Sequence, residues 1–127
     1  MEERIIFKDQ EHGDFFKKCL TRVDVDSYHR ALFYALGICT ETREHIDDIY
    51  DFEVKSININ ALSAGWQTSG TKRICRLAFN LFNGFHYNDA LEPDTSGDFT
   101  PYELFAAQEA KFMIEAVKIR HYNYMRL

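Results

Sequence analysis

Residues Gly65 to Arg73 read GWQTSGTKR and gather the residue types that bind small anions. The first N–H groups of a helix have no partner within the helix and lie at the positive end of its dipole, so phosphate or carboxylate groups bind there. The candidate ligand- or partner-binding residues are Trp66, Gln67, Thr68, Ser69, Thr71, Arg73, Arg76 and Asn80. The structural alternative is that Ser69 caps the helix, the glycines turn the chain, and Trp66 fills the core.

The same segment is close to a Walker A phosphate-binding loop, but its residue order is wrong. Gly65 and Gly70 have the spacing of GxxxxGK[ST], yet Thr71 stands where the lysine should be and Lys72 follows it. No strand of a parallel sheet is predicted before the loop, and no acidic strand end is available to hold Mg²⁺. A P-loop nucleotidase is therefore not predicted.

A second near match runs from Glu92 to Glu103 and has the spacing of a calcium-binding loop. Such a loop takes oxygen ligands from alternate positions, with a glycine in the middle and a glutamate at the end. The candidate calcium ligands are Asp94, Ser96, Asp98 and Glu103. The first position carries Glu92 instead of the usual Asp, and Gly84 stops the helix that should lead into the loop. No metal site is predicted, and the calcium loop is kept as the weaker alternative.

The histidines and cysteines do not form a recognisable catalytic or zinc-binding pattern. The five histidines, His12, His29, His45, His86 and His121, include no pair at the i, i+4 spacing that places two imidazoles on one helical face. An acid–base pair could be formed by His45 with Asp48, or by His29 with a distant carboxylate, but such pairs are also common on wet helix faces. The cysteines, Cys19, Cys39 and Cys75, lie in apolar runs without a nucleophile signature. No catalytic residue and no cofactor is predicted.

Helices must position these residues, because apolar side chains recur at helical spacing along most of the chain. The predicted helices cover about Asp9 to Leu20, Asp26 to a stop between Gly37 and Thr40, Glu41 to Asp51, Gly70 to Asn83, and Thr100 to Val117. Ser69 is the expected cap of the fourth helix. Thr100-Pro101-Tyr102-Glu103 predicts a capping box at the start of the fifth, which could break near Gln108 to Ala110.

One segment alternates apolar and polar residues as a strand does. Val54 to Ile59 has this pattern, but no second strand is predicted to pair with it, so it is interpreted as an extended connection. The predicted fold class is therefore all-α, a compact bundle of about five helices with long loops. The 127 residues, of which 46% are hydrophobic, suffice for one domain spanning residues 1–127.

Composition limits the partners and the location. The net charge of −5 argues against direct nucleic-acid binding, and no apolar run is long enough to cross a membrane. An odd number of cysteines favours a reducing compartment, so a cytoplasmic protein is expected. The acidic stretch from Glu41 to Glu53 could imitate a nucleic-acid backbone toward a basic partner, or it could simply be a solvated helix face.

Four segments carry a resemblance to a known family. They are ALFYALGIC at 31–39, AGWQT at 64–68, CRLAFNL at 75–81 and FTPYELF at 99–105. Together they resemble an uncharacterised family of small proteins from Firmicutes and their phages and conjugative elements, over most of the chain from about Tyr28 onward. The resemblance implies a mobile-element setting and supplies no activity.

These observations favour a non-enzymatic interaction protein of a phage or mobile element. It would act as an anti-defence inhibitor that binds a host protein such as a CRISPR nuclease, or that sequesters a signalling nucleotide. The alternative is a small anion- or nucleotide-binding regulatory protein that uses the helix start at residues 65–76. An enzyme of unknown chemistry is a third hypothesis, which depends on His29, His45 and the scattered carboxylates.

Overall fold

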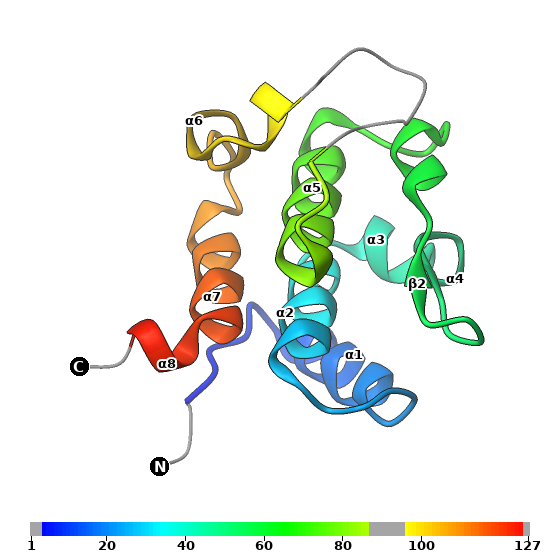
Figure 1. Cartoon of the computed structure of the whole chain (residues 1–127), viewed down its shortest axis with the longest axis vertical. Helices are drawn as coiled ribbons and strands as arrows, with labels where there is room; N and C mark the ends of the chain where they lie inside the picture. The colour runs from blue at the N-terminus through cyan, green and yellow to red at the C-terminus, as the bar shows by residue number, and fades with distance from the viewer. Residues whose placement is uncertain (1–3, 87–95, 126–127) are drawn as a thin grey trace.

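The computed structural model describes residues 4–86 and 96–125, and its central element is the helix α2 (Ser27–Leu36). The sequence allows either Asp26 or Ser27 as the cap of this helix, and it is the Asp26 side chain that accepts a hydrogen bond from the His29 N–H. Every residue from Ala31 to Ile38 is buried. The helices α1 (Gln10–Leu20), α5 (Ser69–Asn83) and α7 (Ala110–Arg120) pack around α2 (Figure 1).

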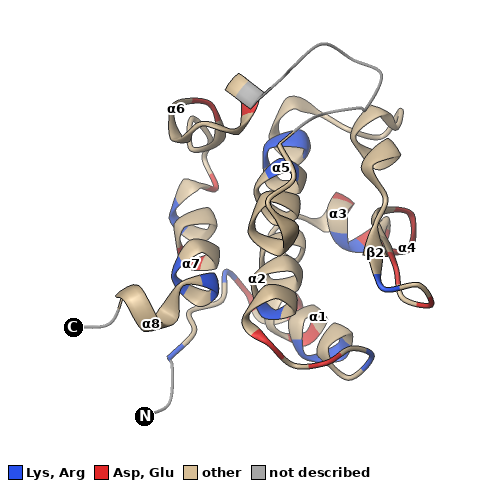
Figure 2. Ribbon diagram, in the orientation of Figure 1, with Lys and Arg blue, Asp and Glu red and all other residues tan. Residues whose placement is uncertain are grey.

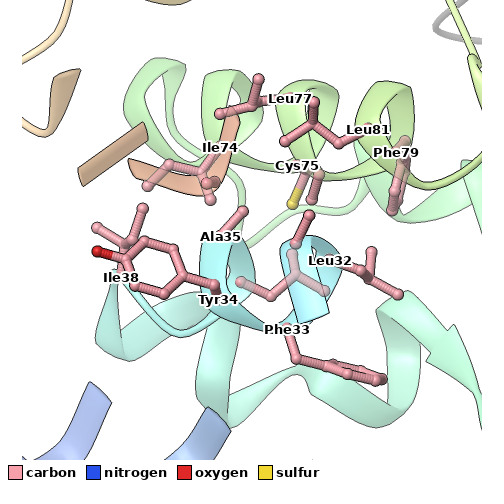
Figure 3. Packing of buried hydrophobic residues seen from close by; sticks show 14 of the residues in the cluster. Leu32, Phe33, Tyr34, Ala35, Ile38, Ile74, Cys75, Leu77, Phe79 and Leu81 are labelled. Carbon is pink, nitrogen blue, oxygen red and sulfur yellow. The ribbon is translucent and has the colours of Figure 1, made fainter. Parts of the chain in front are cut away.

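The contact between α2 and α5 forms the middle of the core. Figure 3 shows Ile74 and Cys75 of α5 beside Ala35 and Leu32 of α2, and each of these four side chains is at most 1% exposed. Burying a large aliphatic side chain stabilises a fold by about 1.5–3 kcal/mol. The apolar stripe predicted for the fourth helix is therefore what holds the start of α5 in place.

The start of α5 is fixed by a reciprocal pair of threonines. Thr68 accepts a hydrogen bond from the Thr71 N–H at 3.1 Å, and the Thr71 hydroxyl accepts one from the Thr68 N–H at 2.8 Å. The predicted cap, Ser69, was wrong by one residue, because only Thr68 has a partner hydroxyl three positions on. The predicted stop is correct: Gly84 ends the helix with a φ of 79°.

The third predicted helix is broken. It forms α3 (Thr40–Glu44) and α4 (Ile46–Ile49), separated at His45, and then the short strand β1 (Tyr50–Asp51). β1 pairs antiparallel with β2 (Ser56–Ile57), so the segment interpreted as an extended connection does have a partner strand. The partner was hidden inside the predicted helix, where Tyr50 turns into the core against the rings of Phe33 and Phe52.

The fifth predicted helix is also broken. It forms α6 (Pro101–Leu104) and then α7, with the break beginning at Phe105, earlier than predicted. The Arg73 side chain donates a hydrogen bond to the Glu103 backbone oxygen at 3.0 Å, which ties α5 to the last turn of α6, next to the break. Thr100 accepts from the Glu103 N–H at 3.4 Å, but the described residues show no return bond from the Glu103 carboxylate, so the predicted capping box is half formed.

The all-α prediction is confirmed, although the described residues contain eight α-helices instead of about five. Besides the two broken helices, the extra element is α8 (Tyr122–Met125). Two short 3-10 helices, η1 (Ile59–Ser63) and η2 (Ser96–Phe99), connect the larger helices. None of the described helices has the length and apolar content required to cross a bilayer.

Candidate ligand-binding site

A pocket of about 300 Å³ opens at the start of α5, the end of this helix that is uppermost in Figure 1. The first turns of α5 contribute Thr68, Ser69, Gly70, Thr71, Arg73 and Ile74. The junction between α2 and α3 adds Cys39 and Glu41, and the segment before α7 adds Ala107, Gln108 and Glu109. We call this site the α5-start pocket.

The backbone of the first turn supplies positive charge to this pocket. Among the described residues, no acceptor bonds the N–H groups of Ser69 and Gly70, whereas the Thr71 N–H is used by the cap. These N–H groups stand at the positive end of a helix of 15 residues. The hydroxyl of Thr71 is already committed, since it donates to the Gln67 Oε1 at 2.6 Å. The pocket can therefore offer two backbone donors to an anion.

Arg73 is the basic side chain in the wall of the pocket. Its Nε donates to the Glu103 oxygen at 3.0 Å, and this bond holds the guanidinium between α5 and α6. Its two terminal nitrogens have no partner in the described part of the chain. A guanidinium held by one nitrogen can still bind a carboxylate or phosphate through the others.

Two carboxylates oppose this positive charge. Glu41 is exposed, and Glu109 forms an ion pair with Lys8 in which the two side-chain atoms lie 3.3 Å apart. The Lys8 Nζ also donates to the Ile38 oxygen at 3.3 Å, and the ion pair is partly exposed, so solvent weakens the compensation of the Glu109 charge. A ligand with several negative charges would be repelled, whereas one anionic group together with a donor group fits both walls.

The cysteine in the pocket does not provide a nucleophile. Burial raises the pKa of the half-buried Cys39 thiol, and nearby Glu109 raises it further. Burial also raises the pKa of Cys19 and that of Cys75 to about 12 each. All three thiols are free, and a protonated thiol is a poor nucleophile. Cys39 therefore acts as an apolar wall of the pocket.

The structure brings half of the sequence-predicted site residues together. Thr68, Ser69, Thr71 and Arg73 line the pocket. Trp66 lies outside it and stacks on the ring of His45, with ring centroids 4.3 Å apart and planes 2° from parallel. Gln67 is also structural, because its amide donates to the Ala61 oxygen at 2.9 Å and accepts from the Thr71 hydroxyl.

The other two predicted residues lie further along α5. Arg76 pairs with Asp98, with the closest atoms 3.8 Å apart, and the Asn80 amide donates to the Phe85 oxygen at 3.1 Å. Sequence analysis missed the walls of the pocket, above all Glu41 and Glu109. No local signal marks these two residues, because only the fold brings them to the start of α5.

The calcium-loop hypothesis falls partly outside the described residues, where Asp94 lies. Ser96 begins η2, and Asp98 is engaged by Arg76. The Glu103 carboxylate is exposed at the start of α6. Within residues 4–86 and 96–125 no group of three His, Cys, Asp or Glu side chains could hold a metal ion.

The two candidate acid–base pairs have structural settings. His29 contacts the nearby Asp26, at 3.0 Å from Nδ1, and not a distant carboxylate; its Nε2 lies 3.2 Å from the Tyr50 hydroxyl. Tyr50 is fully buried, and burial raises the pKa of its hydroxyl. Asp26 and His29 keep 43% and 12% of their side chains exposed, and their contacts join the start of α2 to β1. His45 lies 3.4 Å from Asp48 on the exposed side of the Trp66 stack.

Comparison with known proteins gives the chain a family and no activity. A family of unknown function (DUF6075) matches residues 2–127. No curated protein and no solved structure matches the chain. The function of the α5-start pocket must therefore be argued from its own geometry.

Proposed function

The chain belongs to this family of unknown function, and we propose that it is a non-enzymatic binding protein whose α5-start pocket receives a small ligand with one anionic group. The observation that carries the proposal is the wall of this pocket, where the unbonded N–H groups of Ser69 and Gly70 lie beside Arg73. A carboxylate or a phosphate monoester fits these donors.

The two carboxylates in the opposite wall of the pocket determine which second functional group the ligand must have. Glu41 and Glu109 accept hydrogen bonds from an amino or hydroxyl group. An amino acid or a phosphorylated sugar combines such a group with an anionic end. A polyphosphate does not fit as well, because its additional charges would face these two carboxylates.

The test is calorimetric titration of the whole protein with amino acids, sugar phosphates, mononucleotides, cyclic dinucleotides and inorganic phosphate. Ser69→Pro removes one N–H at the first helical position, where proline is tolerated, and Ser69→Ala removes only the hydroxyl. We expect Ser69→Pro to weaken binding roughly tenfold, and Ser69→Ala to weaken it much less.

Arg73→Gln and Lys72→Gln form the second matched pair, because both remove one positive charge from the same turn and only Arg73 lines the pocket. Binding that falls in Arg73→Gln and persists in Lys72→Gln supports the proposal. Equal losses in the two variants, or no saturable binding of any of these compounds, would reject it.

A second candidate function follows from a separate observation. The side chains of Glu44, Asp47, Asp48, Asp51 and Glu53 are exposed or half-buried along α3, α4 and the β1 turn, and Figure 2 shows acidic residues gathered on this side. Such an edge suits a basic macromolecular surface. As a second candidate function, we propose that the protein is a cytoplasmic anti-defence factor of a phage or mobile element of Firmicutes, and that its partner is a host defence nuclease.

The anti-defence proposal is tested in a bacterial host with active CRISPR immunity. Expression of the protein should restore phage infection, and the variant Asp47→Asn/Asp48→Asn/Asp51→Asn should restore it far less. Lys17→Gln/Lys18→Gln serves as the control, because these two lysines of α1 are exposed, as the three aspartates are, but lie outside the acidic edge. Full immunity in cells that express the native protein would reject this function.

A further inference from the structure

The opposite end of α5 has a groove that the proposed function does not use. Two hollows of about 220 Å³ and 390 Å³ adjoin there and share Arg120 and His121. The smaller hollow lies between the start of α2 and α8, where Ser27, Arg30 and Tyr124 contribute to its wall. The larger lies between Tyr28 and the last turn of α5. We call the two hollows together the α5-end groove.

The groove is basic although the whole chain is acidic. Arg30, Arg120 and His121 line it, and none of the described residues in its walls is an Asp or a Glu. The nearest carboxylate along the chain is Asp26, whose two oxygens lie 3.0 and 3.1 Å from the His29 Nδ1. Figure 2 shows Lys and Arg residues near the lower ends of α2 and α7. An anion can therefore bind here without facing a carboxylate in the walls.

Arg120 is held in a position that leaves part of its guanidinium available. Its Nε donates to the Leu81 oxygen at 2.9 Å, and its guanidinium carbon lies 3.8 Å from the centre of the Tyr28 ring. No other partner of this side chain exists in the described residues. The Leu81 oxygen holds the Nε of Arg120, and the Tyr28 ring covers one face of its guanidinium. The two terminal nitrogens can therefore donate hydrogen bonds to a phosphate.

The two hollows differ in what they can accept. The last turn of α5, at the negative end of the helix dipole, lines the larger hollow and disfavours an anion there, whereas Ser27, in the first turn of α2, lies in the smaller one. Asn80 donates to the Phe85 oxygen and Asn83 accepts from the Phe85 N–H. One amide oxygen of Asn80 and one amide nitrogen of Asn83 remain for a flat, hydrogen-bonding ligand.

We propose that the α5-end groove binds a nucleotide. The phosphate lies in the smaller hollow against Arg30 and Arg120. The base lies in the larger hollow against the face of Tyr28 that Arg120 does not cover, with its edge toward Asn80 and Asn83. Tyrosine rings stack on bases with little sequence preference, and Tyr28 is 45% exposed. The nucleotide is either free or part of a single strand, and the net charge alone did not reveal this local site.

The experiment titrates the whole protein by calorimetry with the four ribonucleoside monophosphates, adenosine, inorganic phosphate, and six-residue oligonucleotides of adenylate and of thymidylate. We expect saturable binding of a monophosphate or an oligonucleotide, and at least roughly tenfold weaker binding of adenosine and of phosphate, which each occupy one hollow. Binding of monophosphates identifies a free nucleotide as the source. Binding of oligonucleotides alone identifies a single strand.

Three variants locate the binding. Arg120→Gln and Arg30→Gln should each weaken it roughly tenfold, and Tyr28→Leu should weaken it severalfold. Arg73→Gln, which alters only the α5-start pocket, is the control that separates this proposal from the proposed function. If Arg120→Gln also lowers the melting temperature, its weaker binding could result from damage to the fold, and the affinity of Arg30→Gln then tests the proposal. The proposal is overturned if the native protein binds none of these compounds. It is also overturned if Arg30→Gln and Tyr28→Leu bind as the native protein does, or if binding is lost in Arg73→Gln instead.

Discussion

The two ends of α5 carry opposite balances of backbone and side-chain charge. At its start the helix presents unbonded N–H groups, and the side chains across the pocket are the carboxylates of Glu41 and Glu109. At its end the helix presents carbonyls, and the side chain that binds one of them is Arg120. Side chains of opposite charge stabilise both helix ends. A ligand can therefore bind only to the N–H, C=O and charged side-chain groups at each end of α5 that have no partner within the protein.

The two sites also differ in what supports them. Cys39, in the wall of the α5-start pocket, follows two residues after Gly37, where an added Cβ would meet His12 and Phe15. The α5-end groove is built from side chains such as Tyr28 and Tyr124, which are 45% and 86% exposed. Substitution of the buried Gly37 should therefore damage the fold, whereas substitution of exposed residues such as Tyr28 should change only the binding surface.

Gly37→Ala should have the largest effect on stability. A Cβ at this position would lie 2.7 Å from the Cδ2 of His12 and 3.1 Å from the backbone oxygen of Phe33. We expect the free energy of unfolding to fall by roughly 2–3 kcal/mol in urea denaturation. Gly65→Ala is the control, because a Cβ added there would meet nothing within 4 Å. Similar losses in the two variants would show that the region around Gly37 is not closely packed.

Local signals predicted the helices that the structure shows as continuous. The Asp26 cap and the Gly84 stop each act within a few residues, so the start of α2 and the end of α5 could be derived from the sequence. The two helix breaks could not. One depends on Tyr50 turning toward Phe33, and the other lies next to the bond from Arg73 to the Glu103 carbonyl, 30 positions away. Contacts between distant residues override local helix propensity at these points.

For the candidate site too, only the part that depends on residues close together in the sequence could be predicted. Thr68, Ser69, Thr71 and Arg73 are neighbours in one stretch of helix, and a pattern of residue types can reveal such neighbours. Periodicity assigned Trp66 no partner, so its stacking on His45 could not be foreseen. The basic groove escaped notice because its residues come from separate helices and the net charge of the chain is negative.

The pH dependence of stability should originate in the core, at His12. This side chain is fully buried; its Nδ1 accepts from the Lys8 N–H at 3.1 Å and its Nε2 donates to the Tyr34 oxygen at 2.8 Å. Burial lowers the pKa of His12 most; Arg43 and Lys8 also lower it, while the Tyr34 bond and Asp9 oppose the change.

The sign of this effect follows from linkage. Because the folded pKa lies below the ordinary value of 6.5, the unfolded chain takes up a proton first as the pH falls. The free energy of unfolding should therefore be constant above about pH 7.5 and decline below pH 6.5. Urea denaturation between about pH 8 and about pH 5 should show a shallower decline in His12→Gln than in the native protein, and an equal decline in the two would contradict this assignment.

Gly84→Ala should cost less than Gly37→Ala, for a different reason. Gly84 has a φ of 79° and open space where a Cβ would lie, so an alanine there meets no atom but holds an unfavourable backbone conformation. We expect a loss of about 1 kcal/mol, and a smaller loss in Gly84→Asn, because asparagine tolerates this conformation better. Thermal melts of both variants give the comparison. A Gly84→Asn variant less stable than Gly84→Ala would indicate crowding at this end of α5.

Glu109→Gln should have the smallest effect on stability and the most specific effect on binding. The ion pair with Lys8 is partly exposed, with 34% of the Lys8 and 27% of the Glu109 side chain accessible, so its loss should cost about 0.5 kcal/mol or less and should matter less in high salt. The same substitution removes a negative charge from the α5-start pocket. Inorganic phosphate should then bind the pocket severalfold more tightly, while binding to the α5-end groove stays the same. An unchanged phosphate affinity would mean that Glu109 does not face the bound anion, and the selection for a ligand with one charge would then depend on Glu41 alone.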